Sequence, residues 1–280
     1  MENHGHNNPI YNNEDAARAH LEGLMWPDGP ICPTCGVVDE ATLMKGKSHR
    51  KGVYQCRACQ KPFSVTVGTV FESSHIPLHK WVYASHLMAA SKKGVSALQL
   101  QRMLGLGSYR SAWFMAHRLR EAMADRNPYS PLGGEGKIVE ADETYYGPVK
   151  DAATERTSGK KYGHSKKGRG PANKRAVIGL VERGGKARMF HVGNADKATV
   201  SAIVRENVDP GSRLHTDESR LYKGADAVFA THETTKHSKG EYARGDVHSN
   251  SVEGFFGVFK KGMKGIYQHC DEKYLGRYLD

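Results

Sequence analysis

Two pairs of cysteines near the N-terminus constrain the fold of this 280-residue chain more than any other feature. Cys32-Pro-Thr-Cys35 and Cys56-Arg-Ala-Cys59 flank a segment that predicts short hairpin strands around Tyr54. Four thiolates in this spacing are typical of a zinc ribbon. A thioredoxin-type redox pair would need one such motif within a β–α–β unit, a pattern that the sequence lacks. We therefore predict one structural Zn²⁺ ion on these four cysteines.

Charge and hydropathy narrow the possible partners of the chain. The formal net charge is +11 and the sequence pI is about 9.3, which favours a polyanionic partner; a generally basic protein without one is the alternative. The sequence also bears on the location of the chain. No apolar run approaches the ~18 residues of a membrane span. The polar N-terminal stretch lacks the apolar core of a signal peptide. We therefore expect a reducing, cytoplasmic location, in which Cys270 is a plain thiol.

The sequence changes character several times along its length. A short helix is expected to begin at Asn12 or Asn13 and to end at Gly23. A later stretch rich in proline and glycine predicts a linker. The predicted segments are an N-terminal helical segment at 1–25, a zinc ribbon at 26–74, a helical domain at 75–126, a linker at 127–136 and an α/β domain at 137–280.

Helical patterns fill the segment that follows the ribbon. One helix is expected from Pro77 to Gly94, a second begins at Ser96, and a third begins at Ser108 after a glycine turn. The last two resemble a helix-turn-helix whose second, basic helix contacts DNA; a hairpin that only packs is the alternative. The predicted DNA contacts are Arg110 and Arg118. The predicted buried stripe is Ala112, Ala116, Leu119 and Met123, with Arg120 and His117 outside it.

The last part of the chain alternates between strand and helix patterns, which predicts a mixed sheet with helices on its faces. In order, we expect strands at 137–141, 176–181 and 187–192, a helix at 196–204, strands at 212–216 and 228–230, and a helix at 248–265.

A basic segment without any acid, residues 156–175, lies between the first two of these strands. Its glycines and its positive charge predict a flexible loop suited to phosphate contact. A solvated insertion is an alternative that is compatible with this role. The predicted phosphate contacts are Lys160, Lys161, Lys166, Lys167 and Arg169.

Three acidic residues stand at positions where phosphoryl-transfer enzymes hold metal ions. Asp142 and Asp217 follow predicted strands, and Glu253 lies on the last predicted helix. Carboxylates are the ligands that Mg²⁺ selects, and this layout is typical of a two-metal site. Lys260 follows Glu253 by two turns, so its ammonium can hold a phosphate on the same helix face. The alternative is three unrelated surface acids.

Residues close to these three acids have to be assigned as well. Asn250, one turn before Glu253, is an alternative neutral third ligand. Glu143 and Glu218 directly follow the two aspartates and should point away from the site, because side chains alternate along a strand. The rest of the last helix is expected to be buried through Phe255, Phe256, Val258 and Phe259.

These motifs resemble the DDE transposases of bacterial insertion sequences, in the group with an N-terminal zinc ribbon. The resemblance runs from about residue 25 onward and rests on CPTCG with CRAC, VEADETYYG, HTDES and HSKGEYARGDVHSNSVEGFFGVFKKGMKGIYQH, of which the last is very specific. It implies that Asp142 and Asp217 are the catalytic aspartates, that Glu253 is the third acid and that Lys260 is the accompanying lysine. Part of the group uses an asparagine as the third catalytic residue, so Asn250 remains an alternative to Glu253 in that role.

The resemblance also implies an α/β fold in which a ribonuclease-H-like mixed sheet with flanking helices follows the zinc ribbon and the helix-turn-helix-like domain. It implies two catalytic Mg²⁺ or Mn²⁺ ions, double-stranded DNA partners (terminal inverted repeats and target), a homodimer or higher oligomer on DNA, and association with the nucleoid. Such proteins usually continue beyond a segment like YLGRYLD, so we expect a truncated copy.

Three functions follow from these expectations. The first is a transposase that cuts element ends and joins 3′-hydroxyls to target DNA. The second is a non-catalytic DNA-binding protein derived from one, and the third is a ribonuclease-H-like nuclease that cuts without joining. The presence of both aspartates, the glutamate and the lysine favours the first.

Overall fold

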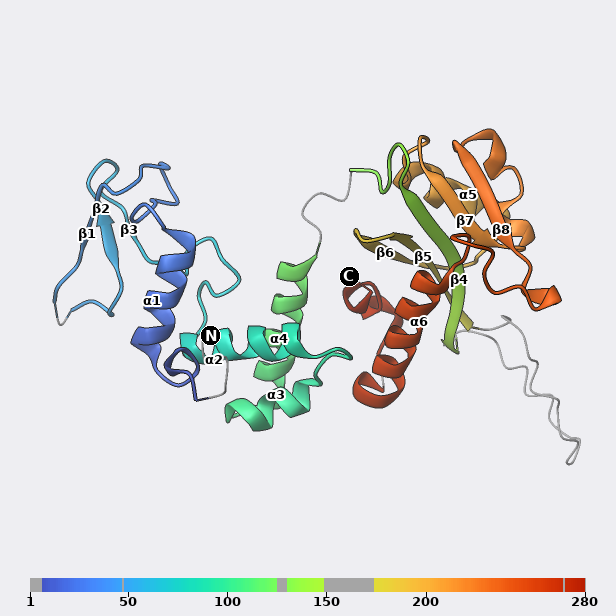
Figure 1. Ribbon diagram of the computed structural model, residues 1–280. Coiled ribbons are helices and arrows are strands. Elements are labelled where there is room, and N and C mark those ends of the chain that lie inside the picture. The colour runs from blue at the N-terminus through green and yellow to red at the C-terminus, as the bar shows by residue number, and fades with distance from the viewer. Residues whose placement is uncertain (1–6, 47, 125–129, 149–173, 269, 280) are drawn as a thin grey trace, which may run out of the picture. The chain divides into compact units, whose positions relative to one another are not determined.

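The computed structural model describes residues 7–46, 48–124, 130–148, 174–268 and 270–279. Its residue contacts divide the chain into two compact units, Met1–Met123 and Ala124–Asp280 (Figure 1). Each unit has hydrophobic cores of its own.

The first unit combines a small antiparallel sheet with several helices. The sheet has the order β1-β2-β3, so the hairpin strands expected around Tyr54 are confirmed. The elements of this unit are η1 (Pro9–Tyr11), α1 (Glu14–Met25), β1 (Ala41–Leu43), β2 (Tyr54–Cys56), β3 (Pro62–Phe63), α2 (Leu78–Ala90), α3 (Ala97–Leu104) and α4 (Tyr109–Met123).

Local hydrogen bonds begin and end these helices near the predicted positions. The side chain of Asn13 accepts backbone N–H groups at the start of α1, and that of Ser96 does the same for α3. Gly105 ends α3 with φ 57°, a left-handed conformation that costs glycine little. The second helix is shorter than expected, because it ends at Ala90 and not at Gly94.

The buried face of α4 differs from the predicted stripe at two positions. Ala112, Ala116 and Leu119 are buried as predicted. Met123, the last helical residue, is 48% exposed, because it extends past the core that α2 and α3 provide. His117 is only 4% exposed, since its ring packs 4.2 Å from the Trp113 ring, so the expectation that it lies outside the stripe was wrong.

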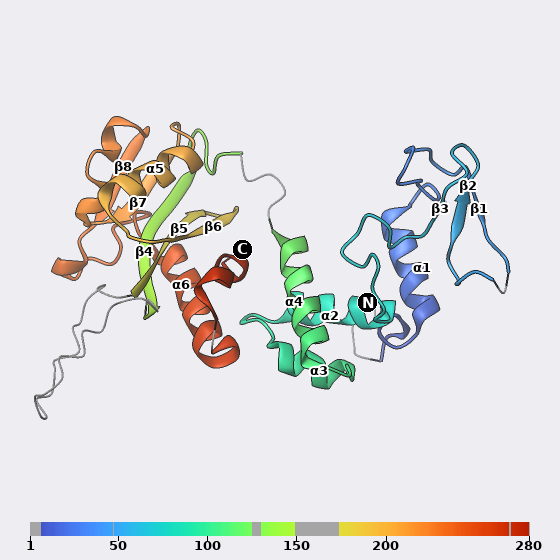
Figure 2. The same ribbon diagram turned by 180° about the vertical axis from the view of Figure 1, so that it is seen from behind.

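The second unit is built on a five-stranded mixed sheet with the order β6-β5-β4-β7-β8 (Figure 2). The pairs β6–β5 and β5–β4 are antiparallel, whereas β4–β7 and β7–β8 are parallel. The elements are β4 (Ile138–Pro148), β5 (Lys174–Glu182), β6 (Ala187–Val192), α5 (Lys197–Asn207), β7 (Arg213–Asp217), η2 (Arg220–Tyr222), η3 (Ala225–Ala227), β8 (Thr231–Thr235), η4 (His237–Lys239), α6 (Asn250–Gly262), a π-helical turn η5 (Met263–Tyr267), η6 (Glu272–Tyr274) and η7 (Gly276–Tyr278).

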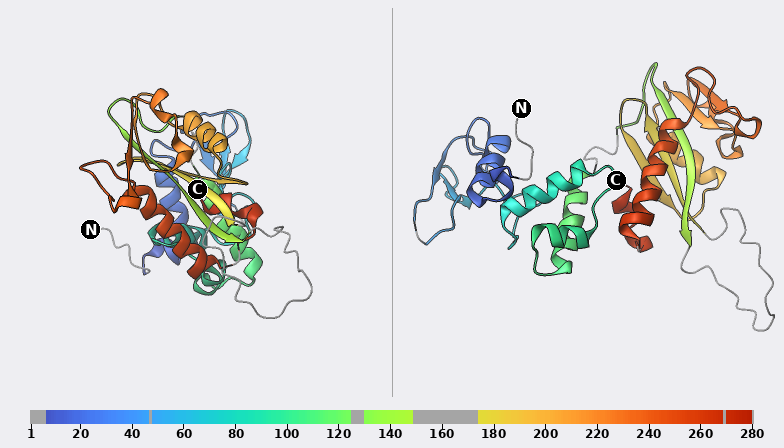
Figure 3. Two further views of the ribbon diagram at one scale, coloured as in Figure 1. Left: turned by 90° about the vertical axis from the view of Figure 1, so that its right-hand side faces the viewer. Right: turned by 60° about the horizontal axis from the view of Figure 1, so that its bottom comes forward.

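Helices α5 and α6 pack on opposite faces of this sheet (Figure 3). Along β5, Ile178 belongs to the core with α5, whereas Val177 belongs to the core with α6, as the alternation of side chains requires. A Cβ atom at Gly179 would lie 2.8 Å from Val252 and Phe256 of α6. Glycine at this position therefore lets α6 lie close against the sheet.

Three predictions for this unit were wrong in detail. The first strand does not end at Asp142, because its pairing with β5 continues to Pro148. The strand expected at 228–230 lies at Thr231–Thr235, since the chain first makes the turn η3. Phe255 is 44% exposed, because the apolar face of α6 that meets the sheet is formed by other residues. No helix among the described residues has the length and apolar character needed to span a membrane.

Candidate functional site

The four predicted cysteine ligands come together in the ribbon. The Sγ atoms of Cys32 and Cys59 lie 3.6 Å apart, as do those of Cys35 and Cys56, and all four lie within 4.8 Å of one another. Four sulfurs bound to one zinc at ~2.3 Å would be separated by ~3.8 Å, whereas a disulfide would require ~2.05 Å. The donor set and its spacing therefore fit a tetrahedral Zn²⁺ ion.

The backbone presents the two cysteine pairs in the same way. In each pair, the residue after the second cysteine has positive φ: 75° at Gly36 and 58° at Gln60. Each of these residues donates its N–H to the carbonyl of the first cysteine of its pair, Cys32 or Cys56, at 2.9 and 3.1 Å. These two matching turns direct the thiols toward a common point.

The two aspartates lie at neighbouring positions of parallel strands. The β4–β7 ladder pairs Glu140 with His215, so two residues farther along each strand Asp142 lies beside Asp217 on the same face. Gly179 is the β5 partner of Asp142 and packs against α6, so this face is the one that α6 covers. The topology therefore brings together two acids that are far apart in the sequence.

Glu143 joins this pair, contrary to the expectation that it points away. Carboxylate oxygens of Asp142, Glu143 and Asp217 lie within 4.8 Å of one another. Glu143 accepts hydrogen bonds from the hydroxyls of Tyr222 (3.1 Å) and Ser219 (3.5 Å). Both partners follow Asp217 in the chain, and they draw the long Glu143 side chain back toward the end of β7. Sequence reasoning missed both residues, although Ser219 is the last residue of HTDES and Tyr222 follows shortly after it.

Glu218 does point away, as expected. Its carboxylate accepts hydrogen bonds from the backbone N–H and the hydroxyl of Ser238, both at 2.9 Å. These bonds hold the pKa of Glu218 below its usual value. It therefore stabilises the loop after β8.

Helix α6 carries the other predicted site residues. Glu253 lies outside the three-acid cluster, and its Oε1 atom accepts the Ser249 hydroxyl at 3.1 Å and lies 3.9 Å from Nε2 of His237. Its side chain is 45% exposed. Asn250 is exposed at the first position of α6, and Lys260 lies two turns beyond Glu253 on the same helix.

The crowding of carboxylates changes their acidity. Burial, followed by the charges of Glu143 and Asp217, raises the pKa of Asp142 to about 8; Glu253 contributes to this shift as well. Burial and the charge of Asp217 also raise the pKa of Glu143. Acids that repel one another in this way are stabilised as anions by a cation, and hard oxygen donors suit Mg²⁺ or Mn²⁺. The cluster therefore fits a divalent metal, with Glu253 within electrostatic reach of it.

The predicted DNA contacts have different surroundings. Arg110 is exposed on α4. Arg118 donates to the carbonyl of Glu72 at 3.0 Å and lies 5.4 Å from the centroid of the Trp81 ring, so it supports the fold of the first unit. The predicted loop contacts, namely Lys160, Lys161, Lys166, Lys167 and Arg169, lie outside the described residues.

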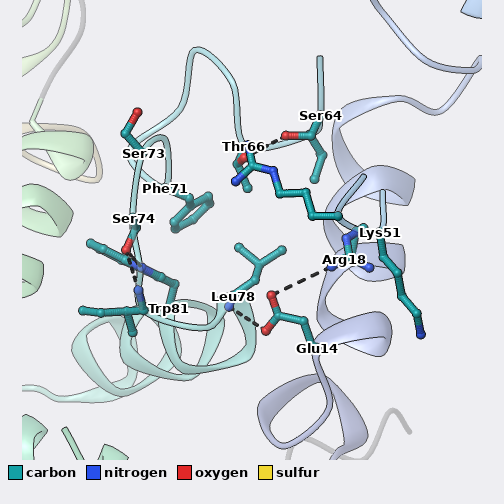
Figure 4. A pocket seen from close by; sticks show the side chains of 13 residues that line it. Glu14, Arg18, Lys51, Ser64, Thr66, Phe71, Ser73, Ser74, Leu78 and Trp81 are labelled. Carbon is teal, nitrogen blue, oxygen red and sulfur yellow. Dashed lines mark hydrogen bonds and ion pairs between the residues drawn. The ribbon is translucent and has the colours of Figure 1, made fainter. Parts of the chain in front are cut away.

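A cavity of about 100 Å³ in the first unit is lined by residues that include Glu14, Arg18 and Leu78, whose contacts serve the fold (Figure 4). The Glu14 carboxylate accepts the backbone N–H of Leu78 at 2.8 Å and lies 3.9 Å from the Arg18 guanidinium. Pro77 gives the start of α2 no side-chain cap. Glu14 of α1 therefore caps the start of α2.

The thiol geometry predicts that the purified protein contains about one zinc per chain. Replacing Cys32 and Cys56 together by serine should abolish zinc binding, because two of four ligands are removed. Elemental analysis would measure this, and Cys270→Ser is the matched control that should keep the metal. A zinc-free protein with an intact, folded ribbon would contradict the assignment.

The raised pKa of Asp142 predicts that stability depends on pH when no divalent cation is added. The pKa is about 8 in the folded protein and about 3.9 in an unfolded chain. The contribution of Asp142 to the free energy of unfolding is therefore fully present below its unfolded pKa, and it is lost as the pH rises through about 8. Asp142→Asn should remove this loss in thermal melts, whereas Asp226→Asn, at an exposed aspartate, should not. An unchanged pH dependence in Asp142→Asn would contradict the crowding described here.

Comparison with known proteins identifies the family. Residues 131–280 match the ISXO2-like transposase domain, and residues 12–62 match the transposase zinc-ribbon domain. The chain is also 28% identical, over 237 residues, to an uncharacterized protein in transposable element ISH50 of Halobacterium salinarum; the match covers 83% of this chain and 77% of that protein. The resemblance seen in the sequence motifs is thereby confirmed, and the chain belongs to the family of transposases with an ISXO2-like domain and a zinc ribbon.

Proposed function

We propose that this chain cuts DNA at the ends of an insertion sequence and joins the freed 3′-hydroxyls to target DNA. The observation that carries the proposal is the adjacency of Asp142 and Asp217 on the face of the sheet that α6 covers. A mixed sheet that brings two acids from neighbouring strands under a helix with a third is consistent with a ribonuclease-H-like catalytic domain. Membership of a transposase family supports DNA cutting and joining as the reaction of this site.

In this proposal, Asp142 and Asp217 hold two Mg²⁺ or Mn²⁺ ions, and Glu253 completes the ligand set. When bound, such ions would activate the attacking oxygen and stabilise the leaving oxygen of a phosphodiester. The strands β4 and β7 hold the two aspartates rigidly, so little rearrangement is needed on binding. Lys260, two turns after Glu253, binds a phosphate of the DNA on the same side of α6.

Glu253 is preferred to Asn250 as the third ligand. A glutamate supplies the negative charge that two adjacent cations need, and an asparagine does not. The charge of Glu253 already acts on the pKa of Asp142. Glu143 has a different role in this proposal: its bonds to Tyr222 and Ser219 brace the segment after Asp217.

Binding of double-stranded DNA rests on the positive charge of the chain, which is +11 overall. The proposed contacts are the exposed Arg110 on α4, the helix-turn-helix-like pair α3–α4 and the basic segment 156–175, apart from Lys174 and Arg175, which belong to β5. Handling two element ends at once favours a homodimer or higher oligomer on the DNA. The proposed location is therefore the bacterial cytoplasm, in association with the nucleoid.

The experiment that tests the proposal incubates the purified chain with Mg²⁺ and DNA carrying the element's own ends. Both cleaved and joined products are expected, because the proposed chemistry includes both steps. Cleavage without joining would replace the proposal by a ribonuclease-H-like nuclease. Binding without either product would replace it by a non-catalytic DNA-binding protein.

Substitution of the three acids should separate chemistry from binding. Asp142→Asn, Asp217→Asn and Glu253→Gln should each lower cleavage by more than ~100-fold, because removing a mere supporting residue already costs ~10–100-fold. Affinity for end DNA should change little, since it rests on the basic surface. Cleavage and gel-shift assays would measure both.

The matched control is Glu218→Gln, which alters a carboxylate directly after Asp217 that is bound to Ser238. It should cleave normally. Asn250→Ala should be milder than Glu253→Gln. The reverse order would show that Asn250 is the third ligand.

The proposed basic loop predicts a salt-dependent affinity. Neutralising Lys160, Lys161, Lys166 and Lys167 to glutamine should weaken DNA binding and reduce the slope of log affinity against log salt. The reduction should reach up to ~3.6, at ~0.9 for each DNA phosphate that a lysine no longer neutralises. Binding titrations across a range of salt concentrations would measure both quantities. An unchanged affinity and slope would identify the loop as a solvated insertion.

A further inference from the structure

The buried carboxylate of Glu140 is the unusual feature of β4. Its side chain is fully buried, and it lies two residues before Asp142, on the same face of the strand. A fully buried charged side chain is unfavourable unless hydrogen bonds and an opposite charge compensate it. In the sequence, Glu140 could be noticed as an acid within the apolar run Ile138-Val-Glu-Ala, two residues before Asp142 and therefore on the same face of the strand.

The Glu140 carboxylate caps the start of α6. Its Oε2 accepts the backbone N–H groups of Ser251 (2.7 Å) and Val252 (3.2 Å), and its Oε1 accepts the Ser251 hydroxyl at 2.9 Å. The residue at the usual capping position, Ser249, makes no such bond. The unpaired N–H groups of the first turn are therefore satisfied by a carboxylate from the sheet, which also matches the helix dipole.

Arg183 completes the junction. It follows β5 directly, and its Nε donates to Glu140 Oε1 at 2.7 Å, which pairs the buried charge. The same guanidinium donates to the backbone carbonyls of Asp246 (2.7 Å) and His248 (3.1 Å). One carboxylate and one guanidinium thus fix both the first turn of α6 and the loop that leads into it.

We propose that Glu140 is a positioning residue, which anchors α6 to β4 so that Glu253 is held within reach of the Asp142–Asp217 pair. Glu253 lies one residue after Val252, within the first turn of α6. Because a helix is rigid over one turn, anchoring the N–H groups of this turn fixes the direction of the Cα–Cβ bond of Glu253 and thus the side of α6 from which its side chain extends. Glu140 and Asp142 share one strand, so the anchor and the site move together. The inference rests on the proposed metal site.

The test is a calorimetric titration of the zinc-loaded full-length chain with Mn²⁺. Glu140→Ala should weaken Mn²⁺ binding by ~10–100-fold, the usual effect of removing a residue that orients a metal ligand. In a Glu253→Gln background, Glu140→Ala should weaken it no further, because the residue acts through Glu253. A merely structural role would weaken binding equally in both backgrounds.

The first unit offers a matched control. Glu14 of α1 also caps a helix that lacks a side-chain cap of its own, through its bond to the Leu78 N–H (Figure 4). Glu14→Ala should lower the melting temperature and leave Mn²⁺ affinity unchanged. An equal decrease of Mn²⁺ affinity in Glu14→Ala and Glu140→Ala would overturn the inference, since general destabilisation would then explain both.

A second variant covers the case in which Glu140→Ala does not fold. Glu140→Gln keeps an oxygen that can accept the α6 N–H groups but removes the charge that pairs with Arg183. It should bind Mn²⁺ less tightly than the wild type and more tightly than Glu140→Ala. Wild-type affinity in Glu140→Gln, or in a folded Glu140→Ala, would overturn the inference.

The failure of this inference differs from failure of the proposed function. If Asp142→Asn and Glu253→Gln weaken Mn²⁺ binding but the Glu140 variants do not, the metal site stands and only the positioning role is overturned. If the wild-type chain binds no Mn²⁺ through these acids, the proposed function and the positioning role are both overturned.

Discussion

The parallel pairing of β4 with β7 is the constraint on which the candidate site depends. The ladder pairs Ile138 with Arg213 and Glu140 with His215. That register sets Asp142 beside Asp217, and a slip by one residue would turn one of them to the opposite face. The antiparallel partner β5 holds β4 on its other side and supplies Gly179, which lets α6 lie close. The acids are thus positioned by backbone hydrogen bonds and by packing, before any ion binds.

Charge balance inside the second unit follows from the same arrangement. On the face that α6 covers, the buried Glu140 is matched by Arg183 and by helix N–H groups. Two residues farther along β4, Asp142 has mainly acids around it, and its pKa is raised to about 8. The charge of Glu140 is therefore compensated by protein groups, whereas the charge of Asp142 has no such compensation from the acids around it. We propose that a divalent metal fills that role.

Local patterns in the sequence predicted much of this fold. The paired cysteines, the caps at Asn13 and Ser96, and the order of strands and helices in the second unit are all determined by nearby residues, and the structure bears them out. Strand ends were less predictable, because β4 extends past Asp142 only through its pairing with β5, a partner distant in the sequence.

Side-chain directions at the site were the hardest feature to predict. Alternation along β4 correctly separates Glu143 from Asp142, yet the Tyr222 and Ser219 hydroxyls draw the Glu143 carboxylate back to the cluster. The capping of α6 by Glu140 joins residues that are 111 positions apart. Such contacts depend on tertiary structure, so no local pattern around either residue could specify them.

The most direct test of this account is the anomalous diffraction of Mn²⁺ in crystals of the full-length chain. We expect two Mn²⁺ ions ~4 Å apart, contacted by the carboxylates of Asp142 and Asp217 and by Glu253 from the first turn of α6. Absence of Mn²⁺ from this face of the sheet would contradict the proposed metal site. So would ions held by Asp142, Asp217 and Glu143 with Glu253 turned away.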